Sequence, residues 1–434
     1  MTQTKVLVVL AGAAAGLASS ALANTGTTTD TTRAYAAELA ADAANRSSEV
    51  QSSEGFIISD GANKLRFGGG TQFRYVMNFR DDEVGDDNDF THGFQNRRTS
   101  LWVEGSVVDP NLSFRVRGEW SDVGNSGSDS SFNLLDAFGQ YKFDNGFVVK
   151  FGQMLVPLTR DTGFVSDFGI LGNERSIAEE AFNGGRTQGL ALGYEGEQFR
   201  VIGAFTDGGR TANTDFTNPV EADYSLTGRL DYKTADTWGR FDDQTSFRGQ
   251  DLAMLFGGGI HYQSSGDTGI QTGSNPTVDL LIYTIDATIE GNGWNVFAAF
   301  YGNNVDIDTP GSSSTDNFGF QLQGGVFLTN QVEIFARYDT LFLDKAPAFN
   351  NDEQDFHFLT AGVNYYLAEQ SQAAKFTFDV YWSLNETSGG PDRDLASGQS
   401  QVGIFPVLPN TGGTLLGNPS DGEWGVRAGA QIVW

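Results

Sequence analysis

The sequence contains no cysteine, so disulfide bridges, zinc–thiolate sites and thiol-based catalysis are all excluded. It has only three histidines, His92, His261 and His357, which stand far apart and leave little material for general base catalysis or a histidine metal site. Proline is scarce too, at ten residues against 55 glycines, a balance that favours turns and sheet bends over long helices. We therefore expect no catalytic residues, no metal site and no cofactor; the chain should not be an enzyme.

Long apolar runs are also absent after the N-terminus. The first residues, MTQTKVLVVLAGAAAGLASSALAN, contain one lysine, an apolar core from Val6 to Leu17 and the small-residue site Ala21-Leu22-Ala23. This order is typical of a secretory signal peptide. The alternative, a membrane-anchoring helix, needs roughly 20 apolar residues, more than this core provides. We predict a cleaved signal peptide over residues 1–23 and an exported protein.

Residues 24–63 are rich in threonine, alanine and serine and lack the pattern of the rest of the chain. The stretch TTRAYAAELAADAANRSSEV contains good helix formers, but its apolar stripe is thin. We expect a periplasmic leader here, either helical or semi-ordered, and one β-domain over residues 64–434.

From Leu65 to the C-terminus, apolar and polar side chains alternate with a period of two, which predicts strands with one apolar face. In LRFGGGTQFRYVMNF, for example, Leu65 and Phe67 flank Arg66. Such runs suit tilted strands that cross a membrane in about 9–11 residues each. We predict sixteen strands, near 65–79, 94–108, 112–122, 134–143, 147–154, 188–196, 198–207, 223–232, 252–263, 278–289, 294–303, 318–327, 331–338, 356–366, 375–383 and 424–434.

The connections between these strands alternate in length. Short turns such as DPN, DNG, EGE, GNG and LTN alternate with long acidic loops rich in glycine and serine. Short turns on one rim and long loops on the other are typical of outer-membrane barrels. The sequence thus predicts an all-β fold, a 16-stranded antiparallel transmembrane β-barrel with short periplasmic turns and long extracellular loops. The connection at 233–251 is an exception, which we expect to fold onto the periplasmic rim.

The chain ends on an aromatic residue, in the run WGVRAGAQIVW. Val426, Ile432 and Trp434 share the apolar face of this run. In hydrocarbon every strand edge must be paired, because an unpaired amide costs several kcal/mol. We expect this last strand to close the barrel against the first, with Trp434 in the aromatic belt at the membrane interface.

The faces opposite to the apolar ones should line the lumen, and basic residues predominate on them. Much of the net charge of −28 belongs instead to acidic loops such as RDDEVGDDNDF. A basic wall favours anions, whereas acidic loops repel them on approach, so we expect a water-filled channel for small hydrophilic solutes or ions with a weak anion preference. The predicted pore-lining residues are Arg66, Arg74, Arg98, Arg115, Arg117, Lys142, Lys150, Arg200, Arg229, Arg337 and Arg427.

Three stretches, GFQNRRTSLWVEGSV, DAFGQYKF…VVKFGQMLVPL and NERS…GGRTQGLALGY, resemble the phosphate-selective porin O and P family of outer-membrane channels. The resemblance rests on residues Arg97, Arg98, Gly105, Gly152, Gln153, Pro157, Glu174, Arg175, Ser176, Gly185, Arg186 and Gly189. It implies a trimeric porin in the bacterial outer membrane.

The resemblance also implies that the third long loop, here 155–187, folds inward to narrow the pore. The charged residues of that loop are Arg160, Asp161, Asp167, Glu174, Arg175, Glu179 and Glu180. For Arg175 the sequence leaves open a pore-facing role and a structural role of pinning the loop. Phosphate-specific members carry a lysine-rich central site, where the matching strands of this chain offer Lys142 and Lys150.

Other interpretations remain possible from sequence alone. A soluble two-sheet sandwich would need a second sheet over each apolar face. A surface or structural barrel with a blocked lumen would share every pattern described above. An outer-membrane hydrolase would need a serine–histidine pair that the sequence does not offer. We expect membrane lipid, small solutes or inorganic ions, and two further copies of the chain as partners, and no nucleic acid.

Overall fold

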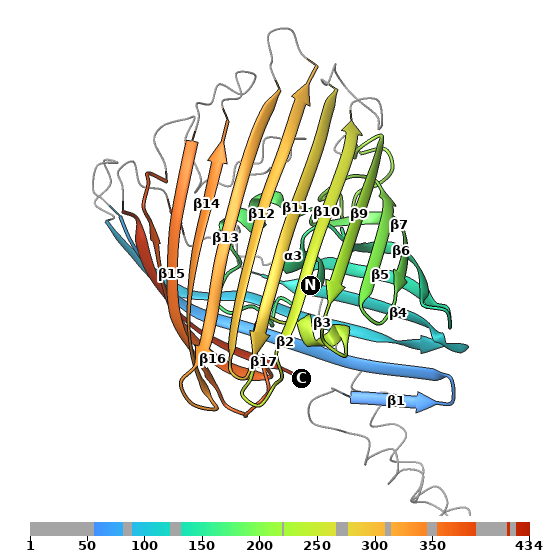
Figure 1. The fold of residues 1–434 in the computed structure, drawn as a ribbon, viewed down its shortest axis with the longest axis horizontal. Helices are drawn as coiled ribbons and strands as arrows, with labels where there is room; N and C mark the ends of the chain where they lie inside the picture. The colour runs from blue at the N-terminus through green and yellow to red at the C-terminus, as the bar shows by residue number, and fades with distance from the viewer. Residues whose placement is uncertain are drawn as a thin grey trace, which may run out of the picture. The chain divides into compact units, whose positions relative to one another are not determined.

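A computed structural model describes residues 56–80, 89–121, 132–218, 221–265, 277–308, 314–344, 354–387, 415–416 and 422–434. In this part of the chain, sixteen strands form one closed antiparallel barrel in which each strand pairs with its neighbours in sequence (Figure 1). The predicted leader over 24–63 and the signal peptide fall largely outside the described residues. No helix among the described residues is long and apolar enough to cross a membrane.

The barrel strands lie within a few residues of their predicted positions. Their bounds are β2 Asn63–Phe79, β3 Phe90–Val107, β4 Asp109–Trp120, β5 Phe132–Lys142, β6 Phe147–Leu155, β7 Arg186–Glu195, β8 Phe199–Thr206, β9 Tyr224–Lys233, β10 Ala253–Ser265, β11 Val278–Gly291, β12 Trp294–Ile307, β13 Thr315–Phe327, β14 Val332–Leu343, β15 Gln354–Tyr366, β16 Ala374–Ser383 and β17 Trp424–Val433.

The ends of the chain meet where the barrel closes. Strand β17 pairs with β2 from Trp424 opposite Phe79 to Val433 opposite Gly70, as the period-two pattern predicts. The amide and carbonyl of Trp434 then both bond Gly69, at 2.9 and 3.0 Å. A short strand that the sequence did not predict, β1 Phe56–Asp60, pairs with the next residues of β2. Residues 56–60 of the expected leader are therefore β-strand.

The outer face of the barrel is apolar, which confirms the predicted phase of the strands. Phe94, Leu192 and Ile285 are among its most exposed side chains, at 74, 64 and 65 %. Aromatic side chains gather at both strand ends, with Phe79 stacked on Trp424 at the long-loop rim and Phe147 against Tyr194 at the short-turn rim. Such aromatic girdles lie at the two membrane interfaces of outer-membrane barrels.

One turn differs from its prediction. The motif DPN, expected to be the turn, lies inside β4, and the chain instead reverses at Val108, whose φ is 67°. Asp109 accepts a hydrogen bond from the amide of Asn111 at 2.9 Å, so its side chain shapes the start of the strand rather than the turn itself.

Candidate channel and the loop inside the barrel

The inward faces of the strands carry the predicted charged residues, but most are not open to water. Arg74, Arg98, Arg117, Arg229, Arg337 and Arg427 are each at most 8 % exposed. Their partners are acidic: Arg229, for instance, lies 2.7 Å from Asp231 and 2.9 Å from Asp286. This part of the barrel interior is thus filled by buried ion pairs rather than forming an aqueous wall.

The segment between β6 and β7 causes this burial because it folds into the barrel. It contains two short helices, α3 Arg160–Phe164 and α4 Ile177–Phe182. Ser176 caps α4 by accepting hydrogen bonds from the amides of Ala178 and Glu179, at 3.1 and 3.3 Å. The loop of 155–187 therefore has the inward course that the family resemblance implies.

An apolar patch on the inner wall receives α4. Ile177, Ala181 and Phe182 pack into a buried cluster with strand residues that face inward, and the ring of Phe182 stacks on Tyr301 at 5.7 Å between centroids. This patch differs from the prediction that lumen-facing positions are polar. The wall residues in the cluster include Leu280, Ile282, Phe297, Leu341, Phe356 and Phe358.

Ion pairs fasten the middle of the loop to the wall of β2–β4. Glu174 pairs with both Arg74 and Arg97. Asp167 pairs with Arg98 at 3.0 Å and with Arg117 at 2.8 Å. Arg97 and Arg98 on β3 and Glu174 and Arg175 in the loop carried the family resemblance. In the structure they belong to one network of ion pairs that fastens the loop to the wall.

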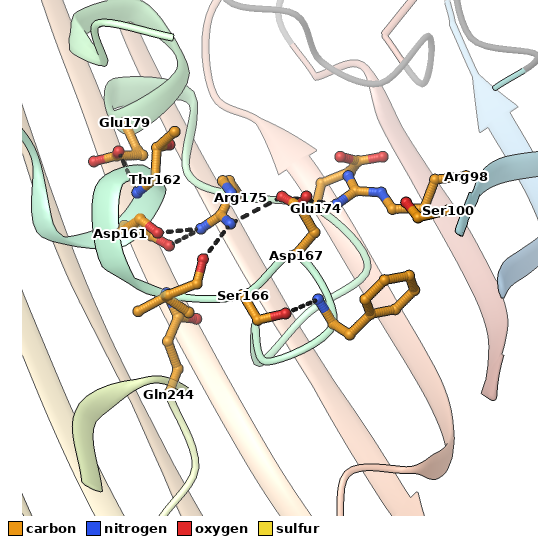
Figure 2. Close-up of polar contacts among 12 residues, drawn as sticks. Arg98, Ser100, Asp161, Thr162, Ser166, Asp167, Glu174, Arg175, Glu179 and Gln244 are labelled. Carbon is orange, nitrogen blue, oxygen red and sulfur yellow. Dashed lines mark hydrogen bonds and ion pairs between the residues drawn. The ribbon is translucent and has the colours of Figure 1, made fainter. Parts of the chain in front are cut away.

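Arg175 adds ion pairs within the loop to this network. Figure 2 shows Arg175 between Asp161, with which it forms an ion pair, and Asp167, from which it lies 3.0 Å away. Arg175 also donates to the carbonyl oxygens of Asp161 and Val165, at 2.6 and 2.9 Å. Of its two possible roles, the geometry fits the structural one.

Burial alone would raise the pKa of Asp167, but the guanidinium groups of Arg98, Arg117 and Arg175 outweigh it and hold that pKa well below its usual range. Glu174 behaves in the same way, because Arg97 and Arg74 together outweigh its burial and lower the pKa. Both carboxylates are therefore charged at neutral pH, and both are neutralised by arginine.

The long periplasmic connection holds the same loop from the other end of the barrel. After a turn of 3-10 helix, η2 Trp238–Phe241, the carbonyl of Asp242 accepts from the amide of Ser166 at 3.0 Å. The backbone amide of Gln244 donates to the carbonyl of Gly169 at 2.9 Å, and its side-chain Oε1 accepts from the backbone amide of Leu171 at 3.0 Å. The connection at 233–251 thus does more than cover the rim, since it supports the loop inside.

A cavity of about 490 Å³ lies between the loop and the wall of β4–β8. Five of the predicted pore-lining residues line it. A sixth cation, Arg186, also lines it; this residue belongs to the family motifs but was not predicted to line the pore. Its lining cations are Arg115, Arg117, Lys142, Lys150, Arg186 and Arg200, and its acids are Asp136, Asp167, Glu195 and Asp242. Of the other predicted pore-lining residues, Arg66 pairs with Glu104, and the rest are buried behind the loop.

Among the predicted loop residues, only Asp167 lines this cavity. Arg160, Asp161, Glu174, Arg175 and Glu179 are at most 6 % exposed. Apolar residues that the sequence analysis missed also face the cavity, including Phe138, Met154, Pro157, Phe164 and Ile202. The alternation of strand residues could have indicated Phe138, but nothing in the sequence places Phe164 beside that wall.

A closed sixteen-stranded barrel with an apolar outer face, aromatic girdles and an inward loop beside a charged cavity defines a porin of the bacterial outer membrane, a channel for passive diffusion. The sequence profile of the phosphate-selective porin O and P family matches residues 69–278, from β2 to the start of β11. This match agrees with the resemblance that the motifs carry. No curated protein matches the sequence.

Solved structures share the fold at low sequence identity. The anion-selective porin from Comamonas acidovorans matches with a TM-score of 0.56 at 14 % identity, over 86 % of this chain and 100 % of that one. The outer-membrane channel DcaP of Acinetobacter baumannii gives 0.56 at 13 % identity, over 88 % and 100 %. OmpT of Vibrio cholerae, in a trimer form, gives 0.52 at 14 % identity, over 85 % and 99 %.

Proposed function

We propose that solutes cross the barrel through the cavity between β4–β8 and residues 157–167, and that this path weakly prefers anions. The observation that carries the proposal is the lining itself, in which six cationic side chains face four acidic ones. Rings of fixed charge bias which ions enter a narrow path. The excess is small, so the preference is weak.

The loop sets the narrowest part of this path because it occupies the β11–β16 side of the interior. Its apolar helix and its ion pairs to the wall hold it there. The fixed position supports a channel that conducts continuously. A barrel with a blocked lumen is the competing hypothesis, and it predicts no conductance from folded protein.

We also propose that three copies assemble in the membrane. The family resemblance implies a trimer, and one matched structure, OmpT of Vibrio cholerae, is described in a trimer form. Cross-linking of the protein extracted in mild detergent would show whether the main species contains three chains.

The charge proposal can be tested in planar lipid bilayers under a gradient of potassium chloride. The sign of the reversal potential should indicate a small excess of chloride over potassium permeability. The double change Arg115→Glu and Lys150→Glu should reverse that sign. Arg117 is not suited to this test because it also holds Asp167 of the loop at 2.8 Å. Lys64→Glu, at an exposed position outside the cavity, is the matched control and should leave the potential unchanged.

A further inference from the structure

Three neighbouring strands bring a ring between two cations on the cavity wall. Arg115 on β4 lies directly opposite Phe138 on β5. On the other side, the Nζ atom of Lys150 on β6 lies 3.8 Å from the centroid of the Phe138 ring. All three side chains line the same cavity. The wall therefore presents an apolar ring flanked by positive charge.

Most other cations of the cavity are already neutralised. Arg186 lies 2.9 Å from Asp136, Arg200 lies 2.8 Å from Asp231 and Lys142 lies 2.7 Å from Glu195. Arg117 pairs with Asp167 and Glu119. These carboxylates cancel the positive charge that an incoming inorganic anion would need.

Lys150 differs from them, because its Nζ atom has no hydrogen bond or ion pair to any residue that the structure describes, and the charge of Asp136 acts on it only from farther away. Arg115 is only loosely paired, at 3.5 Å from Glu104 and 3.8 Å from Asp136. Charge-assisted hydrogen bonds between nitrogen and oxygen are shorter, about 2.7–2.9 Å. Beside the ring of Phe138, one cation is thus unpaired and a second is loosely held.

Several apolar side chains also line the cavity, beside polar ones such as Gln140, Thr162 and Ser166. Met154 and Ile202 belong to one small buried cluster of the wall, and Phe164 comes from the loop. The guanidinium carbon of Arg200 lies 4.1 Å from the centroid of the Phe164 ring and restrains it. A solute in this cavity would contact apolar side chains as well as positively charged ones.

We propose that this cavity is a binding subsite for organic monoanions, carboxylates with an aromatic or apolar body, rather than for inorganic phosphate. The carboxylate lies at Lys150 and Arg115, and the body packs against Phe138 and the surface of Met154, Phe164 and Ile202. Phosphate requires several converging unneutralised donors, whereas a carboxylate is bound by one cation if its body is buried elsewhere. The proposal rests on the proposed passage of anions through this cavity.

The experiment measures how organic anions block the chloride current of the full-length mature protein in planar bilayers. Benzoate, acetate and inorganic phosphate are compared by the concentration that halves the conductance. Benzoate should act at about a tenfold lower concentration than acetate, equivalent to about 1.4 kcal/mol, and phosphate should act no better than acetate.

Substitutions then assign the effect to the site. Lys150→Gln should raise the half-blocking benzoate concentration about tenfold, and Arg115→Gln should raise it less. Phe138→Leu should weaken benzoate about threefold and leave acetate unchanged, since only the ring contact is lost. Lys64→Gln removes one charge outside the cavity and is the matched control. A heat-dependent shift in gel mobility of the purified protein, measured before reconstitution, shows that each variant has folded.

Three results would overturn the inference: equal potency of benzoate and acetate, tighter block by phosphate than by benzoate, or a benzoate block that neither Lys150→Gln nor Arg115→Gln changes. The reversal potential in potassium chloride is measured separately on the same channels. A cation-preferring channel that benzoate still blocks through Lys150 would refute the proposed anion preference and leave the subsite standing.

Discussion

The indole of Trp434 lies against Gly69, so closely that a Cβ atom on Gly69 would sit 2.5 Å from the ring. The same two residues share two backbone hydrogen bonds across the last pair of the closing strands. Glycine at this position lets the terminal aromatic ring lie flat on the outer wall beside Leu101. The contact at the closure of the barrel thus requires both the indole of Trp434 and the lack of a side chain at Gly69.

We predict that Gly69→Val displaces the terminal indole and lowers the yield of folded barrel. Overpacking of a tight contact costs about 1–3 kcal/mol. The folded fraction after refolding into detergent, measured by the shift in gel mobility between unheated and heated samples, should fall. Gly93→Val is the matched control, because a Cβ there meets no atom within 4 Å. An equal loss for both variants would contradict the role of the indole contact.

Arg175→Met should release the loop from its central ion pairs. Asp161, at 1 % exposure, would lose its ion-pair partner, and removal of one member of a buried pair costs about 3–5 kcal/mol. We expect larger and noisier single-channel conductance, because the loop that narrows the path would no longer be held in one position. Arg248→Met is the matched control, because the side chain of Arg248 lies at a periplasmic turn and donates to the carbonyls of Phe327 and Leu328; this variant should conduct as the unchanged protein does. Quiet channels of ordinary size in Arg175→Met would show that the other contacts of the loop suffice to fix it.

Glu179 should make the folded state sensitive to pH. Its burial and the neighbouring carboxylate of Asp161 raise the pKa of Glu179 to about 7, although Thr159, Thr162 and Arg175 favour the charged form. The unfolded chain has a lower pKa for this group, so the folded state binds the extra proton between the two values and loses stability as pH rises through them.

We therefore expect Glu179→Gln to raise the melting temperature at pH 8 relative to the unchanged protein, and to have a much smaller effect at pH 4.5. Thr159 and the amide of Thr162 can still donate to the remaining carbonyl oxygen. Thermal unfolding in detergent at the two pH values measures the difference. A gain that is equal at both values would mean that Glu179 stays ionised, or stays protonated, across the whole range.

The periplasmic support can be tested at Gln244. Gln244→Ala removes the side-chain oxygen that accepts from the backbone amide of Leu171. Leu171 is only 1 % exposed, so water cannot replace that acceptor. An unsatisfied buried amide costs about 1–3 kcal/mol. Hydrogen exchange over residues 166–171 should become faster. Gln331→Ala, which removes a side-chain bond to Leu367 in another periplasmic turn, should leave exchange in that segment unchanged. Unaltered exchange in Gln244→Ala would show that the backbone bonds suffice.

The positions of the sixteen strands could be predicted from the sequence because their pattern is local. A strand with lipid on one side and water on the other must alternate, and the alternation from Leu65 to Trp434 also determines which face is outward. The turn at Val108 shows where this fails. Asp109 and Asn111 are good turn residues, yet strand pairing moved the reversal to a β-branched residue instead.

The candidate site could be predicted only in part. Alternation placed Arg115, Arg117, Lys142, Lys150 and Arg200 on the inner wall, and all of them line the cavity. The same alternation placed Arg337 and Arg427 there, but the loop covers them. Arg337, for example, donates to the carbonyl of Glu174, 163 positions away in the sequence. No local pattern contains such a partner.

The sequence alone therefore determined the barrel, which face of each strand is outward, and the basic residues on the inward faces. Each follows from the period-two alternation, because residues two apart in a strand lie on the same face. Which of the inner cations remain available to a solute was decided only by the tertiary structure. The loop brings its carboxylates to some arginines and its rings to other parts of the wall, and a charge is open or neutralised according to what lies within a few ångströms in space. For Lys150 the described structure brings no carboxylate within ion-pair distance, and this is visible only once the chain has folded.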